Sequence, residues 1–375
     1  MRNPVAAPFW TRYHSSNLSR MARCVDTVLE GSMSRRMMTS AGLLAAASLL
    51  TTVSVTGQEG AASPQAARPA TRSAARSWTP PRTPWGDPDL EGIWPSTDMV
   101  GVPFERPPEL AGRTELSNEE FAAREAQAGR QAQADSQEFV STAPRTGDGT
   151  GPPSHWLEWG KPSRQASLVV EPADGKLPPM TPEGQQRSAS SRNTYVVTTG
   201  FSAANDMGPY DRCISRGVLG STFPVIYNNG NQILQLPGYV VIRYEMIHET
   251  RIIPLDGRSH VSPAIRSYMG DPRGHWEGNS LVVQTTNFNG RTGAQANGNL
   301  SMTSDALELV ERFTRTGPDT IQYQVTVNDP KTWTRPWSVA FPLRRDPDYK
   351  IFEYACHEGN HAMSNILSAA RAEER

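Results

Sequence analysis

Alternation of apolar and polar residues is the strongest pattern in the chain, and it is clearest in residues 238–260. Side chains on a β-strand point alternately to its two faces, so residues of one parity share a face. The even positions of residues 240–252 are almost all apolar or amphipathic, whereas the odd positions are mixed. The pattern therefore predicts one continuous strand here, with His248 on the inner face beside Tyr244.

Shorter segments of the same kind follow one another closely, separated by turns rich in Gly, Pro and Asp. We predict strands at residues 167–170, 231–236, 275–278, 280–288, 307–315, 320–327, 337–343 and 349–356. The strand at 231–236 should form an antiparallel hairpin with the strand after Pro237-Gly238. Strands at this spacing predict a mainly β fold, an antiparallel meander or a barrel. The segment Gly92-Ile93-Trp94 resembles the first strand of many lipocalin-like barrels, so a lipocalin-like barrel is one form of this prediction.

Two helices are expected at the ends of this β-rich region. Ser117-Asn118-Glu119-Glu120 fits a capping box and predicts a polar helix that runs to about residue 134, with Phe121 as its one large apolar residue. Near the C-terminus, Asn360 is expected to cap a short helix. The residues that this short helix should bury are Met363, Ile366, Leu367 and Ala370.

The N-terminal region has the pattern of an export signal. Residues 33–57 combine a basic start, an apolar run and small residues, which is typical of a secretory signal peptide. The apolar run is too short to favour a permanent membrane span. We therefore assign residues 1–57 to a misplaced start plus a signal peptide, and 58–82 to a disordered linker. Residues 83–375 form a single β-rich domain with a helical and loop extension at 83–165, and the mature protein is expected in the periplasm or outside the cell.

Overall charge is balanced, with 37 basic and 38 acidic residues in 375. This balance gives no indication of nucleic acid or of an anionic membrane surface as a partner. The chain has no P-loop, no dinucleotide-binding fingerprint and no Gly-x-Ser-x-Gly elbow, which argues against the corresponding nucleotide, nicotinamide and hydrolase functions. We expect a small-molecule ligand and no cofactor.

Cys213 and Cys356 are the cysteines that remain after removal of the predicted leader. Two cysteines in an exported chain most simply form one disulfide. A nucleophilic Cys356 beside His357 is the alternative. It is disfavoured because neighbouring residues of a strand face opposite ways.

Glu311 is the candidate for acid/base chemistry that the alternation picks out most directly. It shares a predicted strand face with Leu309 and Phe313. A carboxylate in such surroundings must find a partner or take up a proton. It is therefore either a general acid or base, or the structural salt-bridge partner of Arg243 or Arg251.

A wider cluster follows if other polar side chains converge on the same cavity. Glu353 and His357 share a face of the last predicted strand, and His248 is either an acid/base group or a hydrogen-bonded core histidine. The predicted catalytic set is His248, Glu311, Glu353 and His357, and the predicted substrate-binding set is Tyr244, Arg251, Asn287 and Tyr323. The chemistry would be isomerisation, hydration or elimination of a partly apolar substrate. Trp156 and Trp159, with Glu158 between them, either roof such a pocket or anchor a loop.

Two alternatives stay open at this point. A metal-dependent enzyme could use His248, His260 and His357. The segment His357–His361 also matches the H-E-x-x-H zinc motif, but it contains a glycine and straddles the end of a predicted strand instead of lying on a helix. The other alternative is a non-catalytic binding or structural protein of the cell envelope.

Four segments of the chain carry a resemblance to a family. They are GYVVIRYEMIHETRIIPLDGR, DPRGHWEGNSLVVQTTNF, LVERFTRTGPDTIQYQVTVNDP and YACHEGN. In order and spacing they resemble a large group of exported proteins of environmental Gram-negative bacteria, over residues 83–374. That group typically has an aromatic residue at the position of His361, which argues against the zinc motif. The resemblance implies export and a shared pocket and points to no substrate.

Overall fold

The structure is a computed structural model that describes residues 78–135, 156–193 and 201–374, and its sheets consist of antiparallel strands. Contacts divide the chain into residues 1–72 and 73–375, and all described residues belong to the second unit. The predicted signal peptide and residues 58–77 of the predicted linker lie outside the described residues.

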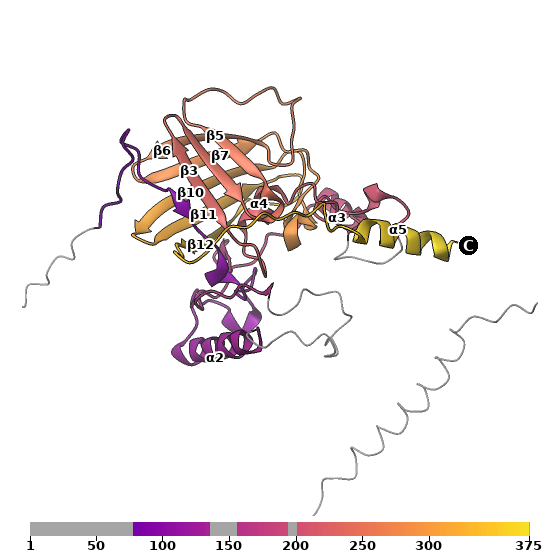
Figure 1. Cartoon of the computed structure of the whole chain (residues 1–375), viewed down its shortest axis with the longest axis horizontal. Coiled ribbons are helices and arrows are strands. Elements are labelled where there is room, and N and C mark those ends of the chain that lie inside the picture. Colours follow the sequence, from indigo (N-terminus) through magenta and orange to yellow (C-terminus); the bar gives the residue numbers. More distant parts are fainter. Residues whose placement is uncertain (1–77, 136–155, 194–200, 375) are drawn as a thin grey trace, which may run out of the picture. The chain divides into compact units, whose positions relative to one another are not determined.

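Two main sheets and one small sheet make up the described β structure (Figure 1). The four-stranded sheet has the order β1-β3-β4-β5 and consists of β1 (Gly92–Ile93), β3 (Asn231–Leu236), β4 (Tyr239–Tyr244) and β5 (Thr250–Pro254). The six-stranded sheet has the order β2-β12-β11-β10-β7-β6 and consists of β2 (Val169–Glu171), β6 (Asp271–Glu277), β7 (Ser280–Thr286), β10 (Glu308–Gly317), β11 (Thr320–Asn328) and β12 (Trp337–Arg344). The small sheet pairs β8 (Gly293–Gln295) with β9 (Leu300–Met302).

Helices occupy the connections between the strands and the C-terminal end of the described region. The α-helices are α2 (Asn118–Asp135), α3 (Pro182–Ser190), α4 (Gly217–Thr222) and α5 (Ala362–Glu373). Short 3-10 turns are η2 (Thr97–Met99), η3 (Pro108–Leu110), η5 (Ala204–Asp206), η6 (Met246–His248) and η7 (Ala296–Gly298). The predicted capping box of α2 is confirmed: Glu120 N donates to Ser117 Oγ over 3.2 Å, and Ser117 N donates to Glu120 Oε2 over 2.7 Å.

One apolar core lies between the two main sheets, as the alternation in the sequence requires. Both sheets contribute inward side chains to it, including Ile242 from β4 and Val283 from β7, which are at most 1% exposed. Aromatic rings fill the centre. Tyr323 lies 5.0 Å from Phe313 and 5.2 Å from Phe341 between ring centroids. The predicted face shared by Leu309, Glu311 and Phe313 of β10 is buried in this core, so that prediction is confirmed.

The predicted hairpin of residues 231–236 with the strand after Pro237-Gly238 is confirmed as well. β3 pairs with β4 around Pro237-Gly238, and β6 pairs with β7 around Gly278-Asn279. The strands β10, β11 and β12 then form a meander. The predicted barrel is not formed by the described strands, because β2 and β6 are edges of the six-stranded sheet and β1 and β5 are edges of the other.

The continuous strand predicted for residues 240–252 is wrong. It is a hairpin: β4 ends at Tyr244, the chain turns at η6, and β5 returns so that Tyr239 pairs with Pro254. Ile247 and His248 have φ values of 61° and 47°, in the left-handed region, and these two residues reverse the chain. The turn interrupts the alternation, so His248 is exposed, whereas Tyr244 is buried as predicted.

The strand predicted at 349–356 is also absent. Its backbone bonds to a side chain and to its own turn instead of to a neighbouring strand: Phe352 N donates to Glu245 Oε1 over 3.1 Å, and Cys356 N donates to Tyr354 O over 2.8 Å. We call residues 344–356 the C-terminal strap.

The cysteine prediction is confirmed, while the predicted cap of the last helix is wrong. Cys213 and Cys356 form a disulfide with a Cα–Cα distance of 5.7 Å. His361, not Asn360, occupies the N-cap position of α5. The Asn360 amide instead donates to Asp211 O over 3.2 Å and lies 3.3 Å from Cys213 Sγ, beside the disulfide.

Candidate functional site

Arg251 of β5 and Glu311 of β10 form a buried ion pair that joins the two main sheets. The guanidinium donates to both carboxylate oxygens, over 3.1 Å to Oε1 and 2.6 Å to Oε2. The two side chains are 1% and 0% exposed. Two-pronged pairing of this kind satisfies a carboxylate that the apolar face would otherwise leave uncompensated. Of the alternatives left open for Glu311, the structure shows the salt bridge with Arg251.

Neutral hydroxyl groups complete this pair. Tyr323 donates to Glu311 Oε1 over 3.1 Å, while Arg251 donates to Tyr244 Oη and Thr285 Oγ1, each over 3.0 Å. Burial raises the pKa of Tyr244 and raises that of Tyr323 well above its usual value, so both phenols keep their protons at neutral pH. We call these five residues the buried network. Its geometry fits a structural tie between the sheets.

The remaining predicted site residues do not join the buried network. His248, Glu353 and His357 are exposed, and Asn287 donates to Val261 O over 3.1 Å at the end of β7. His248 Nδ1 lies 3.2 Å from Tyr354 O, so this imidazole contacts the C-terminal strap instead of the core. The structure thus brings together Glu311, Tyr244, Arg251 and Tyr323 and separates the other four predicted residues from them.

The histidines proposed as metal ligands are also apart. His260 Nδ1 lies 3.0 Å from Asp271 Oδ2, while His248 contacts the strap. In the described ranges, no three His, Cys, Asp or Glu side chains lie close enough together to hold a metal ion. Residues 357–361 lie before the first turn of α5, so the H-E-x-x-H segment lacks the helix that would align its histidines.

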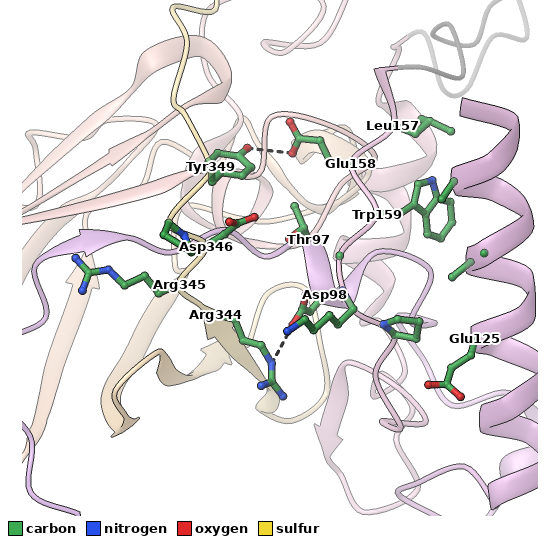
Figure 2. A pocket seen from close by; sticks show the side chains of 17 residues that line it. Thr97, Asp98, Glu125, Leu157, Glu158, Trp159, Arg344, Arg345, Asp346 and Tyr349 are labelled. Atoms are coloured by element: carbon green, nitrogen blue, oxygen red, sulfur yellow. Dashed lines mark hydrogen bonds and ion pairs between the residues drawn. The ribbon is translucent and has the colours of Figure 1, made fainter. Parts of the chain in front are cut away.

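A cavity of about 830 Å³ lies elsewhere, between α2, the segment 157–162, η2 and the C-terminal strap. We call it the α2 groove. Figure 2 shows helix α2 with Glu125 along one side and Arg344, Arg345 and Tyr349 from the strap across from it. Its volume is typical of a site for a small molecule. Sequence reasoning missed the contribution of α2 and the strap, because no local pattern shows that these two segments line the same cavity.

A carboxyl, a phenol and a second carboxyl meet at one wall of the α2 groove. Tyr349 Oη lies 3.0 Å from Glu158 Oε2 and 2.6 Å from Glu245 Oε2 (Figure 2 shows the contact with Glu158). Glu245, which is 1% exposed, lies behind this wall, and Glu158 lines the cavity. Burial, followed by the two carboxylates, raises the pKa of Tyr349, so the phenol stays protonated and can donate.

The backbone around these groups is fixed by further bonds. Asn229 donates to Glu158 Oε2 through both its N and its Nδ2, each over 3.1 Å. The carboxylate of Glu245 accepts from Gly230 N over 3.2 Å. Glu245 is also the residue directly before the turn η6, which contains His248. The sequence signal for this part of the site is the Trp156–Trp159 segment.

The rest of the lining combines a tryptophan with charged side chains. Trp159 lies beside α2 in Figure 2, and a methyl group added at Gly101 would come within 3.0 Å of its ring. Asp98 Oδ2 lies 2.9 Å from Arg344 Nε, and Asp98 Oδ1 accepts from Lys161 N over 2.7 Å. Trp156 does not line the cavity and packs against Tyr227 with ring centroids 6.3 Å apart. Of the two tryptophans predicted to roof a pocket, Trp159 is the one at the cavity.

Comparison with known protein families, curated proteins and solved structures gives no significant match. None of the helices in residues 78–135, 156–193 and 201–374 has the length and apolar character that a membrane crossing requires.

Proposed function

We propose that this protein binds a small, partly apolar molecule in the α2 groove. The observation that carries the proposal is the cavity itself, of about 830 Å³, whose lining combines aromatic and aliphatic side chains with polar ones. Trp159, Leu157 and Ala128 supply apolar surface, and Tyr349 and Glu158 supply hydrogen-bonding groups. Ligand sites commonly combine apolar lining with a few convergent polar groups.

The charges of the α2 groove indicate how it selects a ligand. Cations and carboxylates line it in similar numbers: Lys161, Arg344 and Arg345 against Asp98, Glu125, Glu158 and Asp346. Because both signs are present, the net charge of a ligand is not strongly selected. We infer a neutral or zwitterionic ligand with one apolar face and several hydrogen-bonding groups.

A thermal-shift screen of the mature protein against neutral and zwitterionic compounds tests the proposal. A ligand of the native state raises the melting temperature, by an amount that grows with its concentration. We expect the shift given by a hit to fall in Trp159→Ala and in Glu125→Ala and to remain in Trp85→Ala, since Trp85 is a partly exposed tryptophan outside the cavity. Each shift is measured against the same variant without ligand, so a variant that is merely less stable is not misjudged. Equal loss in Trp85→Ala, or no loss in the two groove variants, contradicts the proposal.

A second candidate function is cofactor-free acid/base catalysis at the same cavity. It is favoured by the Tyr349 hydroxyl lying within 3.0 Å of Glu158 and 2.6 Å of Glu245 at the wall. The protonated phenol of Tyr349 can give a proton to a bound substrate while the Glu158 carboxylate, which lines the cavity, takes one from it, so the proton transfers of an isomerisation balance. Tyr349→Phe should then abolish conversion of a hit compound, followed by NMR of the mixture, and leave its binding within about threefold. A hit that wild-type protein leaves unchanged supports binding alone.

We also propose that the protein acts outside the cytoplasm. The support is the signal-peptide pattern of residues 33–57 together with the Cys213–Cys356 disulfide, a bond that persists in oxidising compartments. Cell fractionation followed by intact-mass analysis tests this. Full-length protein in the cytoplasm with free thiols would contradict it.

A further inference from the structure

A second cavity, of about 510 Å³, has a strongly basic lining. It lies at the end of α3, beside η5 and the loop before β8, and it shares no lining residue with the α2 groove. We call it the arginine hollow. Its charged lining residues are Arg187, Arg192, Arg212, Arg291 and Asp206.

Two of these guanidiniums are held in place by partners at one end. Arg187 donates to Thr332 Oγ1 over 2.8 Å and to Glu183 Oε1 over 2.6 Å. Arg212 donates to Asn205 Oδ1 over 2.8 Å. Because this amide oxygen is a neutral acceptor, it leaves the charge of the guanidinium uncompensated. Arginines whose positions are fixed in advance lose less conformational freedom when they bind an anion.

The single lining carboxylate is largely occupied. Asp206 Oδ2 accepts from Ser202 N over 2.9 Å and from Ala203 N over 3.0 Å, and it lies 3.1 Å from Arg192 Nη1. Those backbone bonds, followed by Arg192, lower the pKa of Asp206, so it is ionised at neutral pH and offsets one positive charge. Arg291 is exposed, and its guanidinium has no ion pair within the described residues.

The excess of positive charge in the arginine hollow favours an anionic ligand. Four guanidiniums against one lining carboxylate, with exposed Glu183 as the further partner of Arg187, leave a positive potential in the hollow. Guanidinium groups match the oxygens of phosphate in pairs of parallel hydrogen bonds. A phosphate monoester has a charge of about −1.5 to −2 at neutral pH, whereas a carboxylate has one negative charge. The α2 groove, with balanced charges, would not make this selection.

We propose that the arginine hollow is a second ligand site, which binds a phosphoryl group presented as a phosphate monoester or as pyrophosphate. Ser191 also lines the cavity, and its hydroxyl, which accepts from Asn193 Nδ2 over 3.4 Å, can donate a hydrogen bond to a remaining oxygen. This site is independent of the proposed function of the α2 groove, because the two cavities consist of different residues.

Titration calorimetry of the mature protein with pyrophosphate and with phenyl phosphate, at constant ionic strength, tests the proposal. Arg291→Gln is the diagnostic variant, because it removes an exposed guanidinium without disturbing a bond within the described residues. We expect it to weaken binding on the order of tenfold, the effect of losing one charge-assisted contact. Arg335→Gln is the matched control, since Arg335 is exposed and lines neither cavity, and it should leave the dissociation constant unchanged. Trp159→Ala should leave it unchanged as well.

Vesicles containing phosphatidic acid, compared with pure phosphatidylcholine vesicles, distinguish a lipid headgroup from a soluble ligand. Binding to either phosphoryl source that weakens in Arg291→Gln and persists in Arg335→Gln supports the site and identifies the source. No binding to any of these probes, or equal weakening in both variants, overturns it. Either result leaves the test of the α2 groove intact.

Discussion

Glu311 shows how one residue can look catalytic in the sequence and be structural in the fold. Its place on an inward strand face was predictable from the two-residue alternation of β10, and Arg251 was one of two arginines within reach. The hydroxyl groups of Tyr244, Tyr323 and Thr285 surround the pair, and Arg251 Nε is buried without a hydrogen-bond partner among the described residues. With three hydrogen bonds inside the core, the carboxylate joins the two sheets instead of serving as a free acid or base.

Glu311→Ala should destabilise the protein by about 2–4 kcal/mol, because it leaves Arg251 charged and buried without its partner. Urea unfolding followed by fluorescence measures this loss. The double variant Glu311→Leu with Arg251→Met removes both charges and should recover most of it. A loss below about 0.5 kcal/mol for Glu311→Ala would be typical of a surface residue and would contradict the observed burial.

Glu249 gives a prediction about pH. Burial raises its pKa, and Arg216 N donates to its Oε2 over 3.2 Å. A raised pKa in the folded state means that the folded protein holds this proton more tightly than the unfolded chain does. The contribution of Glu249 to stability is therefore present below the unfolded pKa of about 4.3 and is lost as pH rises through the folded pKa.

The free energy of unfolding of wild type should therefore fall relative to that of Glu249→Gln as pH increases from about 4 to 7. Urea titrations of both proteins at several pH values measure the difference. A difference that stays constant over this range would mean that Glu249 titrates alike in the folded and unfolded states.

The prediction that His248 lies on an inner face was wrong because of the backbone conformation of two residues. In the sequence, the alternation of residues 240–252 continues through Met246–His248. In the structure, these residues form the turn η6. Ile247 and His248 both adopt positive φ, although neither is glycine, asparagine or aspartate, the residues that usually announce such a turn. The alternation of apolar and polar residues does not reveal this reversal of the backbone. The imidazole of His248 was therefore predicted on the inner face of the strand, whereas it is exposed.

Among the elements, the hairpins were the most predictable. Two-residue turns such as Gly278-Asn279, flanked by alternating segments, determine both the pairing and the register of β6 with β7. The capping box of α2 was predictable for a similar reason, since it depends on residues three apart. The irregular elements were not predictable: the C-terminal strap is held by Glu245 and by a disulfide, partners more than a hundred residues away in the sequence.

The C-terminal strap supplies one wall of the α2 groove, and the disulfide anchors its end. The bond joins residues 143 positions apart, and loop closure of that size corresponds to about 4–5 kcal/mol in the chain-entropy model. Cys213→Ser with Cys356→Ser should therefore lower the free energy of unfolding by about this amount. Wild-type protein should show no free thiol under native conditions. Two titratable thiols, or an unchanged stability in the double variant, would contradict the bridge.

At the scale of the whole molecule, the sequence predicted a mainly antiparallel β fold and one shared core but not how the two sheets are joined. A barrel and two facing open sheets require the same alternation along each strand, and they differ only in whether edge strands pair. The candidate site was foreseen only in part. Trp159 and Glu158 were singled out, whereas Tyr349 and helix α2 reach the cavity through tertiary contacts that no local pattern encodes.

The central claim is that ligand binding takes place in the α2 groove. The most direct test is hydrogen–deuterium exchange of the mature protein, measured with and without the strongest hit of the ligand screen. Ligand contact should slow exchange in peptides that cover residues 118–135, 156–162 and 344–349, the three segments that line most of the cavity. Exchange in the arginine hollow, reported by peptides around residues 205–212, should not change. Protection confined to the sheets, for example to residues 308–328, with no change at α2 and the strap, would contradict the account.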